Sequence, residues 1–524
     1  DIYDEKLAKT QFLEQFETLY NNNNAESAAL AELPTAYDYI RLGHPLSCVL
    51  EWAIAKSYQL KPENVISFSS QSTPILAVLR KNLFLKRNTQ ILYSHKLPAN
   101  FNADIIRSIY GYQFELKRIT STDAIPDFNG TTIWIASEDT IGDYKLESKI
   151  DFYVGLHQKL GSILLVNGKQ NESYTSEIQH VRRRETIAMT PSNTLNALHE
   201  LIGNQSLDEH NRDDHANKTS VLNSIRKICN TEIPAVLASS GLSMQYGIVM
   251  GLIHDAFEKH PEKKIKIVVP PNCYGGTNDQ ARRVAACLSQ VEVMDLPVDG
   301  AHDMVQSVEN VLEKIALEDA IPYIIAEIPT NPRVEVPDLQ MLKEALSKVR
   351  KTKTGAIAID PVFILDQTFC PNVHFLGEED ILSSVRTIAY VSGSKFPSGG
   401  KCTAGYGVAN KKAEALMEKI ALHLKICDNE ATSLQLEILA QQLPTMNQRI
   451  QDAYLNTREF VNFIQKKLPA AKINFVSEEL AQQGFTPSVF SLDLPTKGNT
   501  PEEKEAYKRK LNHQLIGLML SLIH

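Results

Sequence analysis

The sequence has no long hydrophobic run, no excess of positive charge and no phosphate-binding motif typical of nucleotide-binding proteins. Its longest apolar stretches, such as IPYIIAEIP, are far shorter than the roughly 20 residues that a membrane-spanning helix needs. The net charge of −8 argues against a surface for nucleic acid. Neither GxGxxG after a strand nor GxxxxGK[ST] occurs. We therefore expect no membrane span, no nucleic-acid partner and no common nucleotide-binding fold.

Cysteine is scarce as well. Seven cysteines are scattered along the chain, and none belongs to a CxxC pair or a Cys/His cluster. This spacing predicts neither a zinc site nor a disulfide framework, so we expect no bound metal. A sparse, odd set of thiols is typical of a reducing compartment, and we expect a cytoplasmic protein.

Strand-like and helical patterns alternate through most of the 524 residues. Short, β-branched runs such as KIKIVVP, YIIAEIP, GAIAID and TIAYVSG are separated by amphipathic helical stretches. This rhythm predicts an α/β fold with a mostly parallel sheet. From about residue 410 the pattern changes to long helices with one strand, SVFSLDLP, which predicts a separate, smaller α+β domain. The chain stops in an apolar helical pattern, LIGLMLSLIH, so we expect that domain to be incomplete.

Two blocks of the sequence repeat one another weakly. VISFSSQSTPILAVL resembles PAVLASSGLSMQYGIVM, and the runs before and after them keep the same order in both blocks. We interpret residues 36–167 as a degenerate first copy of the block at 187–360. The expected domains are a degenerate partial copy at 1–180, a large domain at 181–410 and the small domain at 411–524. The alternative is that all α/β units share such patterns.

Polar residues collect after the predicted strands, where ligands bind in parallel sheets. SSG, ending at Gly241, offers helix N-terminal N–H groups to an anion. CYGGT places the Tyr274 ring on a glycine-rich turn, and EIPTNP places Asn331 in a stiff loop. GAIAID ends in Asp360, a carboxylate that needs a cationic partner if it is buried. SGSK presents Ser392, Ser394 and Lys395 at the end of one predicted strand.

Together and in this order, these motifs resemble the cystathionine γ-synthase-like (Cys/Met metabolism) family of enzymes that use pyridoxal 5′-phosphate (PLP). The resemblance implies PLP-dependent fold type I, with a large domain of seven-stranded type. It also implies that Lys395 holds PLP as a Schiff base beside Ser392 and Ser394, and moves the α-proton. LPTMNQR resembles a motif of the family's small domain, with Pro444 where a lysine is usual.

The same resemblance assigns the remaining contacts to PLP. Backbone N–H groups of Gly241 and Leu242 would hold the phosphate, and Tyr274 would stack on the ring and take part in catalysis. Asn331 would lie at the 3-oxygen side of the ring. Asp360 would pair with the ring nitrogen, which must stay protonated for PLP to withdraw electrons.

Two of these choices have rivals in the sequence. Asp366, in ILDQTFCP, resembles the family's D-N-T-F motif more closely, but Asp360 ends an apolar run directly, and we favour Asp360. Lys401 lies inside the glycine-rich loop rather than at the strand end, so we expect it to be an exposed loop lysine.

The family's phosphate clamp, Y-x-R-x-G-N-P, occurs in the first block rather than the second. YIRLGHP gives Tyr39 and Arg41 in register, and a guanidinium suits a phosphate dianion. In the second block these places are interpreted as Ile187 and Met189. The hypothesis is that the first copy supplies Tyr39 and Arg41 while the second holds PLP.

The resemblance implies a lyase or transferase of sulfur amino acid metabolism (transsulfuration). The substrate would be a small amino acid such as cystathionine, a homoserine ester, methionine or cysteine, with elimination or replacement at the γ- or β-carbon, and we favour the γ-carbon. The family's substrate-carboxylate arginine is not visible in the sequence. A homodimer or homotetramer is expected from the family. The alternative is an inactive scaffold or regulatory homologue.

Overall fold

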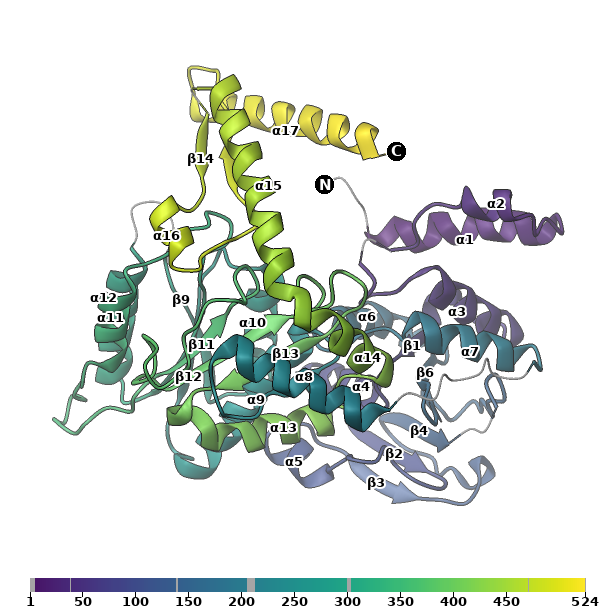
Figure 1. Ribbon diagram of the computed structural model, residues 1–524. Coiled ribbons are helices and arrows are strands. Elements are labelled where there is room, and N and C mark those ends of the chain that lie inside the picture. The colour runs from purple at the N-terminus through teal and green to yellow at the C-terminus, as the bar shows by residue number, and fades with distance from the viewer. Residues whose placement is uncertain are drawn as a thin grey trace.

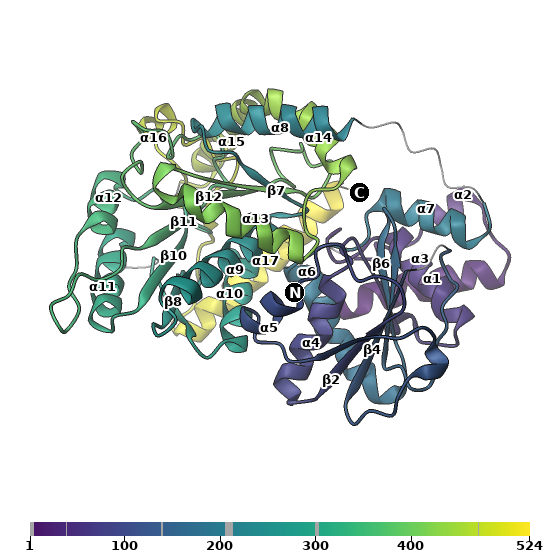
Figure 2. The ribbon, with the colours of Figure 1, turned by 90° about the horizontal axis from the view of Figure 1, so that it is seen from below.

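We describe the protein from a computed structural model, which covers residues 5–37, 39–137, 140–204, 213–298, 303–469 and 471–523. Two sheets lie in two units placed side by side, and helices pack on both (Figures 1 and 2). The α/β fold class with mostly parallel sheets is therefore as predicted. Within the described residues, no helix has both the length and the apolarity needed to cross a bilayer.

The first unit contains a six-stranded sheet in the order β1-β6-β5-β4-β2-β3. β6 runs antiparallel to both of its neighbours, and the other pairs are parallel. Its strands are β1 (Val65–Phe68), β2 (Thr89–Tyr93), β3 (Glu115–Arg118), β4 (Thr131–Ser137), β5 (Phe152–His157) and β6 (Gly161–Val166). The helices of this part of the chain are α1 (Glu5–Asn21), α2 (Ser27–Ala31), α3 (Pro45–Ser57), α4 (Thr73–Leu85), α5 (Ala103–Ser108), α6 (Thr175–Arg184) and α7 (Pro191–Leu201).

The second unit contains a seven-stranded sheet in the order β7-β13-β12-β11-β10-β8-β9. β13 is antiparallel to both neighbours, and the remaining pairs are parallel. Its strands are β7 (Val236–Ala238), β8 (Ile265–Val269), β9 (Val291–Asp295), β10 (Ile321–Glu327), β11 (Val362–Asp366), β12 (Thr387–Ser392) and β13 (Gly405–Ala409). Its helices are α8 (Asp214–Cys229), α9 (Gly241–Lys259), α10 (Gly275–Cys287), α11 (Met304–Leu317), α12 (Leu339–Ser347) and α13 (Met417–Ile426).

The two sheets have corresponding strand orders. Each order begins with the first strand of its unit, β1 or β7, beside an antiparallel neighbour, β6 or β13. Each order ends with three parallel strands, β4-β2-β3 in the first sheet and β10-β8-β9 in the second. The first sheet equals the second with one central parallel strand removed. A duplication of one ancestral unit, followed by loss of a strand, would produce this arrangement.

Helices α9 and α13 pack closely against one another beside the second sheet. A Cβ on Gly247 or Gly251 of α9 would lie 2.8 Å from atoms of Leu424 or Ile420 of α13, so glycine lets the two helices touch. α13 therefore belongs to the helical layer over this sheet, although we expected the small domain to start at residue 411. The two units contact one another at Arg80 of α4, which donates to the Tyr246 hydroxyl of α9 at 3.3 Å and forms a buried ion pair with Glu185.

The C-terminal unit is mostly helical and carries a two-stranded antiparallel sheet of β14 and β15. The long α15 projects from the second unit in Figure 1. Its elements are α14 (Ser433–Gln442), α15 (Met446–Lys467), β14 (Lys472–Asn474), α16 (Glu478–Gln482), β15 (Ser491–Asp493) and α17 (Pro501–Ile523). The strand expected within SVFSLDLP is present as β15.

Candidate functional site

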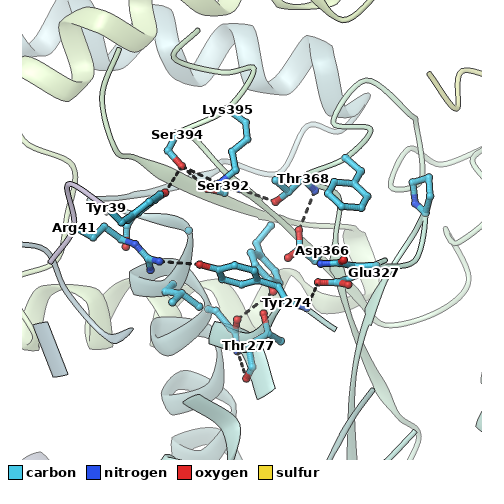
Figure 3. A pocket seen from close by; sticks show the side chains of 18 residues that line it. Tyr39, Arg41, Tyr274, Thr277, Glu327, Asp366, Thr368, Ser392, Ser394 and Lys395 are labelled. Atoms are coloured by element: carbon cyan, nitrogen blue, oxygen red, sulfur yellow. Dashed lines mark hydrogen bonds between the residues drawn. The ribbon is translucent and has the colours of Figure 1, made fainter. Parts of the chain in front are cut away.

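A pocket lies at the carboxyl ends of the second sheet's strands (Figure 3). It is lined from both units, by Tyr39, Arg41, Ser240, Gly241, Leu242, Gln245, Tyr274, Thr277, Glu327, Pro329, Asn331, Asp366, Thr368, Phe369, Tyr390, Ser392, Ser394 and Lys395. Every site residue proposed from the sequence is in this set except Asp360.

The first feature of the pocket is the N-terminus of α9. The Ser240 side chain caps the helix by accepting a hydrogen bond from the Ser243 N–H at 3.0 Å. The N–H groups of Gly241 and Leu242 belong to the first turn, where a helix supplies no carbonyl partner. A Cβ at position 241 would lie 2.8 Å from the Ser392 Cβ, so glycine allows this turn to approach the lysine strand. The turn is thus a cradle suited to an oxyanion.

The second feature is the loop after β12. The Ser392 and Ser394 hydroxyls lie 3.0 Å apart, and the Lys395 Nζ donates to the Ser394 Oγ at 3.2 Å. β12 thus delivers two hydroxyls and one amine to the pocket. Lys401 is exposed in the loop that follows, as expected.

The third feature is a pair of carboxyl groups. Glu327 and Asp366 end the neighbouring parallel strands β10 and β11 and lie opposite one another in the register. Asp366 Oδ1 accepts from the Thr368 N–H at 2.9 Å, and Glu327 Oε1 accepts from the Tyr274 N–H at 2.9 Å. Glu327 Oε2 is buried and receives no hydrogen bond.

Burial makes it costly to ionise both members of this pair. It is the main cause that raises the pKa of Glu327 to about 8, and the neighbouring Asp366 raises it further. Burial also raises the pKa of Asp366, against the opposing effects of Thr368 and Lys395. Two adjacent carboxyl groups of this kind hold one proton between them near neutral pH.

The prediction that Asp360 ends a buried strand was wrong. Residues 355–360 form no strand, and Asp360 precedes β11, at the opposite end of the sheet from the pocket. Its side chain is exposed and its carbonyl accepts from Arg386. The aspartate at the carboxyl end of the strand is Asp366.

Tyr274 and Asn331 lie at two sides of the pocket. Tyr274 occupies the N-cap position of α10 and is 40% exposed, so its ring is available to a ligand. Its hydroxyl accepts from Arg41 Nη2 at 2.9 Å. Asn331 follows β10 in the proline-stiffened loop, and its carbonyl accepts from Asn272.

Tyr39 and Arg41 reach the pocket from the first unit of the same chain. The Tyr39 hydroxyl lies 2.9 Å from the Ser394 Oγ, and the Arg41 guanidinium lies over the Tyr39 ring, 4.6 Å from its centroid. Burial alone would raise the pKa of Tyr39, but Arg41 and Lys395 together lower it. Arg41 is buried and its Nε has no hydrogen-bond partner, so the guanidinium keeps capacity for an anion.

The residues of the second block that correspond to Tyr39 and Arg41 differ from those interpreted from the sequence. α3 follows His44 and α7 follows Thr190, each with proline at the first helical position. Aligning these helix starts puts Glu185 and Ile187, rather than Ile187 and Met189, opposite Tyr39 and Arg41. Glu185 is bound by Arg80, so the second unit still offers no clamp.

Sequence reasoning missed several pocket residues. Thr368 accepts from the Ser392 N–H at 3.0 Å and donates its own N–H to Asp366, so it joins β12 to the carboxyl pair. The Tyr390 hydroxyl donates to Gln245 Oε1 at 3.2 Å. The DQTF segment carried the signal for Thr368 and Phe369, but the preference for Asp360 set it aside.

A family model described as "Cys/Met metabolism PLP-dependent enzyme" matches residues 165–498, which is more than half of the chain. No curated protein matches the sequence.

Solved structures with a similar arrangement include three enzymes. Cystathionine γ-lyase CalE6 of Micromonospora echinospora is 14% identical with a TM-score of 0.40, over 55% of this chain and 69% of that one. MetB of Corynebacterium glutamicum is 16% identical with a TM-score of 0.39 over the same shares. Yeast cystathionine γ-lyase is 18% identical with a TM-score of 0.39, over 49% of this chain and 58% of that one.

Proposed function

Because this chain belongs to the family of Cys/Met metabolism PLP-dependent enzymes, we propose that its pocket catalyses elimination or replacement on a sulfur amino acid. The substrate class comprises cystathionine, homoserine esters, methionine and cysteine, with reaction at the γ- or the β-carbon. The observation that carries the proposal is the convergence of Lys395, Asp366 and the α9 cradle on one pocket.

The residues present fit PLP. The cradle at Gly241 and Leu242, with the Ser392 and Ser394 hydroxyls nearby, suits a phosphate. Arg41 supplies the charge that such a dianion needs, through a buried guanidinium with an unpartnered Nε. These groups therefore form one anion-binding end of the pocket.

The other end of the pocket suits a protonated aromatic ring. Asp366 would hold the ring nitrogen, and because Glu327 keeps a proton, the pair presents a single negative charge to a single positive one. Tyr274 would lie on the ring face and Asn331 beside the ring's 3-oxygen. The carboxyl pair and the phosphate cradle thus fix the two ends of one ligand.

Lys395 is the proposed catalytic base. PLP, when bound, withdraws electrons from the α-carbon of an amino acid attached to it. The Lys395 Nζ then takes up the α-proton and returns a proton later in the reaction. Tyr39, Ser394 and Lys395 form a hydrogen-bonded row, and the Arg41 guanidinium lies over the Tyr39 ring.

The site takes its clamp from the first unit of its own chain. In the family that the motif resembles, the tyrosine and arginine of this clamp reach in from a neighbouring subunit, whereas here one chain brings the groups together. We therefore propose that the first unit replaces the partner subunit at this site. Homodimer or homotetramer formation would then serve another purpose than completing this clamp.

A second candidate function is that of an inactive scaffold or regulatory subunit. The degenerate first unit favours it, because that unit has lost the lysine loop. An inactive homologue should not bind PLP covalently at Lys395.

The test is the visible absorbance of the purified protein. We expect a yellow protein whose band is absent in Lys395→Ala and retained in Lys401→Ala, with borohydride attaching PLP to Lys395. Release of 2-oxobutyrate from cystathionine or methionine would identify γ-chemistry, and pyruvate from cysteine or cystathionine would identify β-chemistry. A colourless protein that takes up no added PLP would support the scaffold instead.

A further inference from the structure

The first unit contains a second cradle built like the one in the pocket. Thr73 N–H donates to Ser70 Oγ at 2.9 Å, as Ser243 N–H donates to Ser240 Oγ at 3.0 Å. The Ser70 and Thr73 hydroxyls also contact one another, as the Ser240 and Ser243 hydroxyls do. Gln71 therefore stands where Gly241 stands in the pocket.

The chain segments that support the two cradles also correspond. Ser239 N–H donates to the Asn429 carbonyl at 2.9 Å, and Ser69 N–H donates to the Ile187 carbonyl at 3.2 Å. Asn429 follows α13, and Ile187 follows α6, which is the equivalent helix of the first unit. Each cradle is thus supported by the loop that follows α6 or α13, the corresponding helix of its own unit.

The first cradle already holds an anion from the chain itself. The Asp428 Oδ2 accepts the Gln71 N–H at 2.7 Å, and that N–H is the counterpart of the Gly241 N–H. The preceding carbonyl, of Cys427, accepts hydrogen bonds from the Ser70 and Thr73 hydroxyls. Asp428 has a φ of 50°, so the loop adopts a left-handed conformation at the residue that enters the cradle.

The rest of the first unit's site is closed. Residues 158–160 join β5 to β6, where residues 393–404 carry the lysine loop in the second unit. The Gln71 side chain donates to the His157 carbonyl at the end of β5, across the space between cradle and strand. A glycine at position 71 would leave that space open.

We propose that Asp428 is an internal stand-in for phosphate, which occupies the first unit's oxyanion site and joins the two units through it. The chain then has one cradle open to a phosphate-bearing cofactor and one filled by its own carboxylate. Only the statement about the open cradle rests on the proposed function. The filled cradle is defined by contacts of Asp428 outside the PLP pocket.

The experiment counts inorganic phosphate bound per full-length chain by equilibrium dialysis, with and without PLP. The wild type should bind about one equivalent, displaced by PLP. Asp428→Gly removes the carboxylate and suits the left-handed backbone. It should bind about one further equivalent, which PLP leaves in place. Glu430→Ala, which removes a nearby exposed charge, should behave as the wild type.

A folded Asp428→Gly variant that binds no more phosphate than the wild type would overturn the proposal. So would an equal gain in Glu430→Ala, because the gain would then come from net charge alone. If Asp428→Gly does not fold, Asp428→Asn keeps the size and weakens the acceptor, and the same extra equivalent must appear at higher phosphate concentration. Failure of PLP to displace phosphate from the wild type would instead count against the proposed function.

Discussion

The Tyr39 hydroxyl and the Ser394 Oγ lie 2.9 Å apart, although 355 residues separate them in the chain. The contact joins the first unit to the lysine loop of the second. It therefore makes the first unit part of the site, and its contribution can be measured.

Arg41→Ala should weaken PLP binding. It removes a buried guanidinium from the phosphate end of the pocket, and a hydrogen bond between charged groups contributes about 1.5–3 kcal/mol, or roughly 10- to 150-fold in affinity. PLP titration of the cofactor-free protein measures the change. Arg118→Ala, at an exposed arginine of the same unit, is the control. Unchanged affinity in Arg41→Ala would show that the first unit takes no part.

One pair of variants distinguishes the roles of Asp366 and Asp360. Asp366→Asn should lose most of the visible absorbance and most activity, because a neutral amide no longer balances a protonated ring nitrogen. Asp360→Asn should behave as the wild type, since its exposed side chain lies at the other end of the sheet. Absorbance spectra of both variants, recorded with saturating PLP, provide the comparison. The reverse result would restore the assignment made from the sequence.

The Asp360 error shows what a single sequence leaves open. Two apolar runs, GAIAID and VFILD, lie next to one another and both end in aspartate. Pro361 between them indicates that they are not one strand, but periodicity does not say which run pairs with β10. That choice depends on the register of Glu327 opposite Asp366, a contact between distant segments.

The local parts of the site were predictable for a physical reason. A glycine-rich turn into a helix and a lysine after a buried strand are properties of neighbouring residues, so their spacing reveals them. Contacts such as Asp428 with Gln71 depend on how two units pack, and spacing carries no information about them. The placement of Tyr39 and Arg41 came from a motif resemblance rather than from periodicity.

Gly241→Ala should impair PLP binding although the substitution is small. The new Cβ would lie 2.8 Å from the Ser392 Cβ and 2.9 Å from its Cα, so the cradle or β12 must shift. We expect roughly tenfold weaker PLP binding, the effect of about 1.4 kcal/mol. Gly275→Ala is the matched control, because a Cβ there meets no atom within 4 Å. Equal affinities in the two variants would contradict the proposed cradle.

Glu327→Gln should change how the stability of the cofactor-free protein depends on pH. The pKa of Glu327 is raised from 4.5 to about 8, so the folded state binds more protons than the unfolded state between these values. Stability contributed by the protonated form is therefore complete below pH 4.5 and is lost as pH rises toward 8. The lost contribution is on the order of 5 kcal/mol, and glutamine, which never ionises, should avoid the loss. Urea denaturation from pH 5 to pH 9 should show the two proteins diverging as pH rises, with Glu335→Gln, at an exposed position, following the wild type. Parallel pH profiles for wild type and Glu327→Gln would mean that Glu327 is ionised beside Asp366, and that the pair presents two negative charges rather than one.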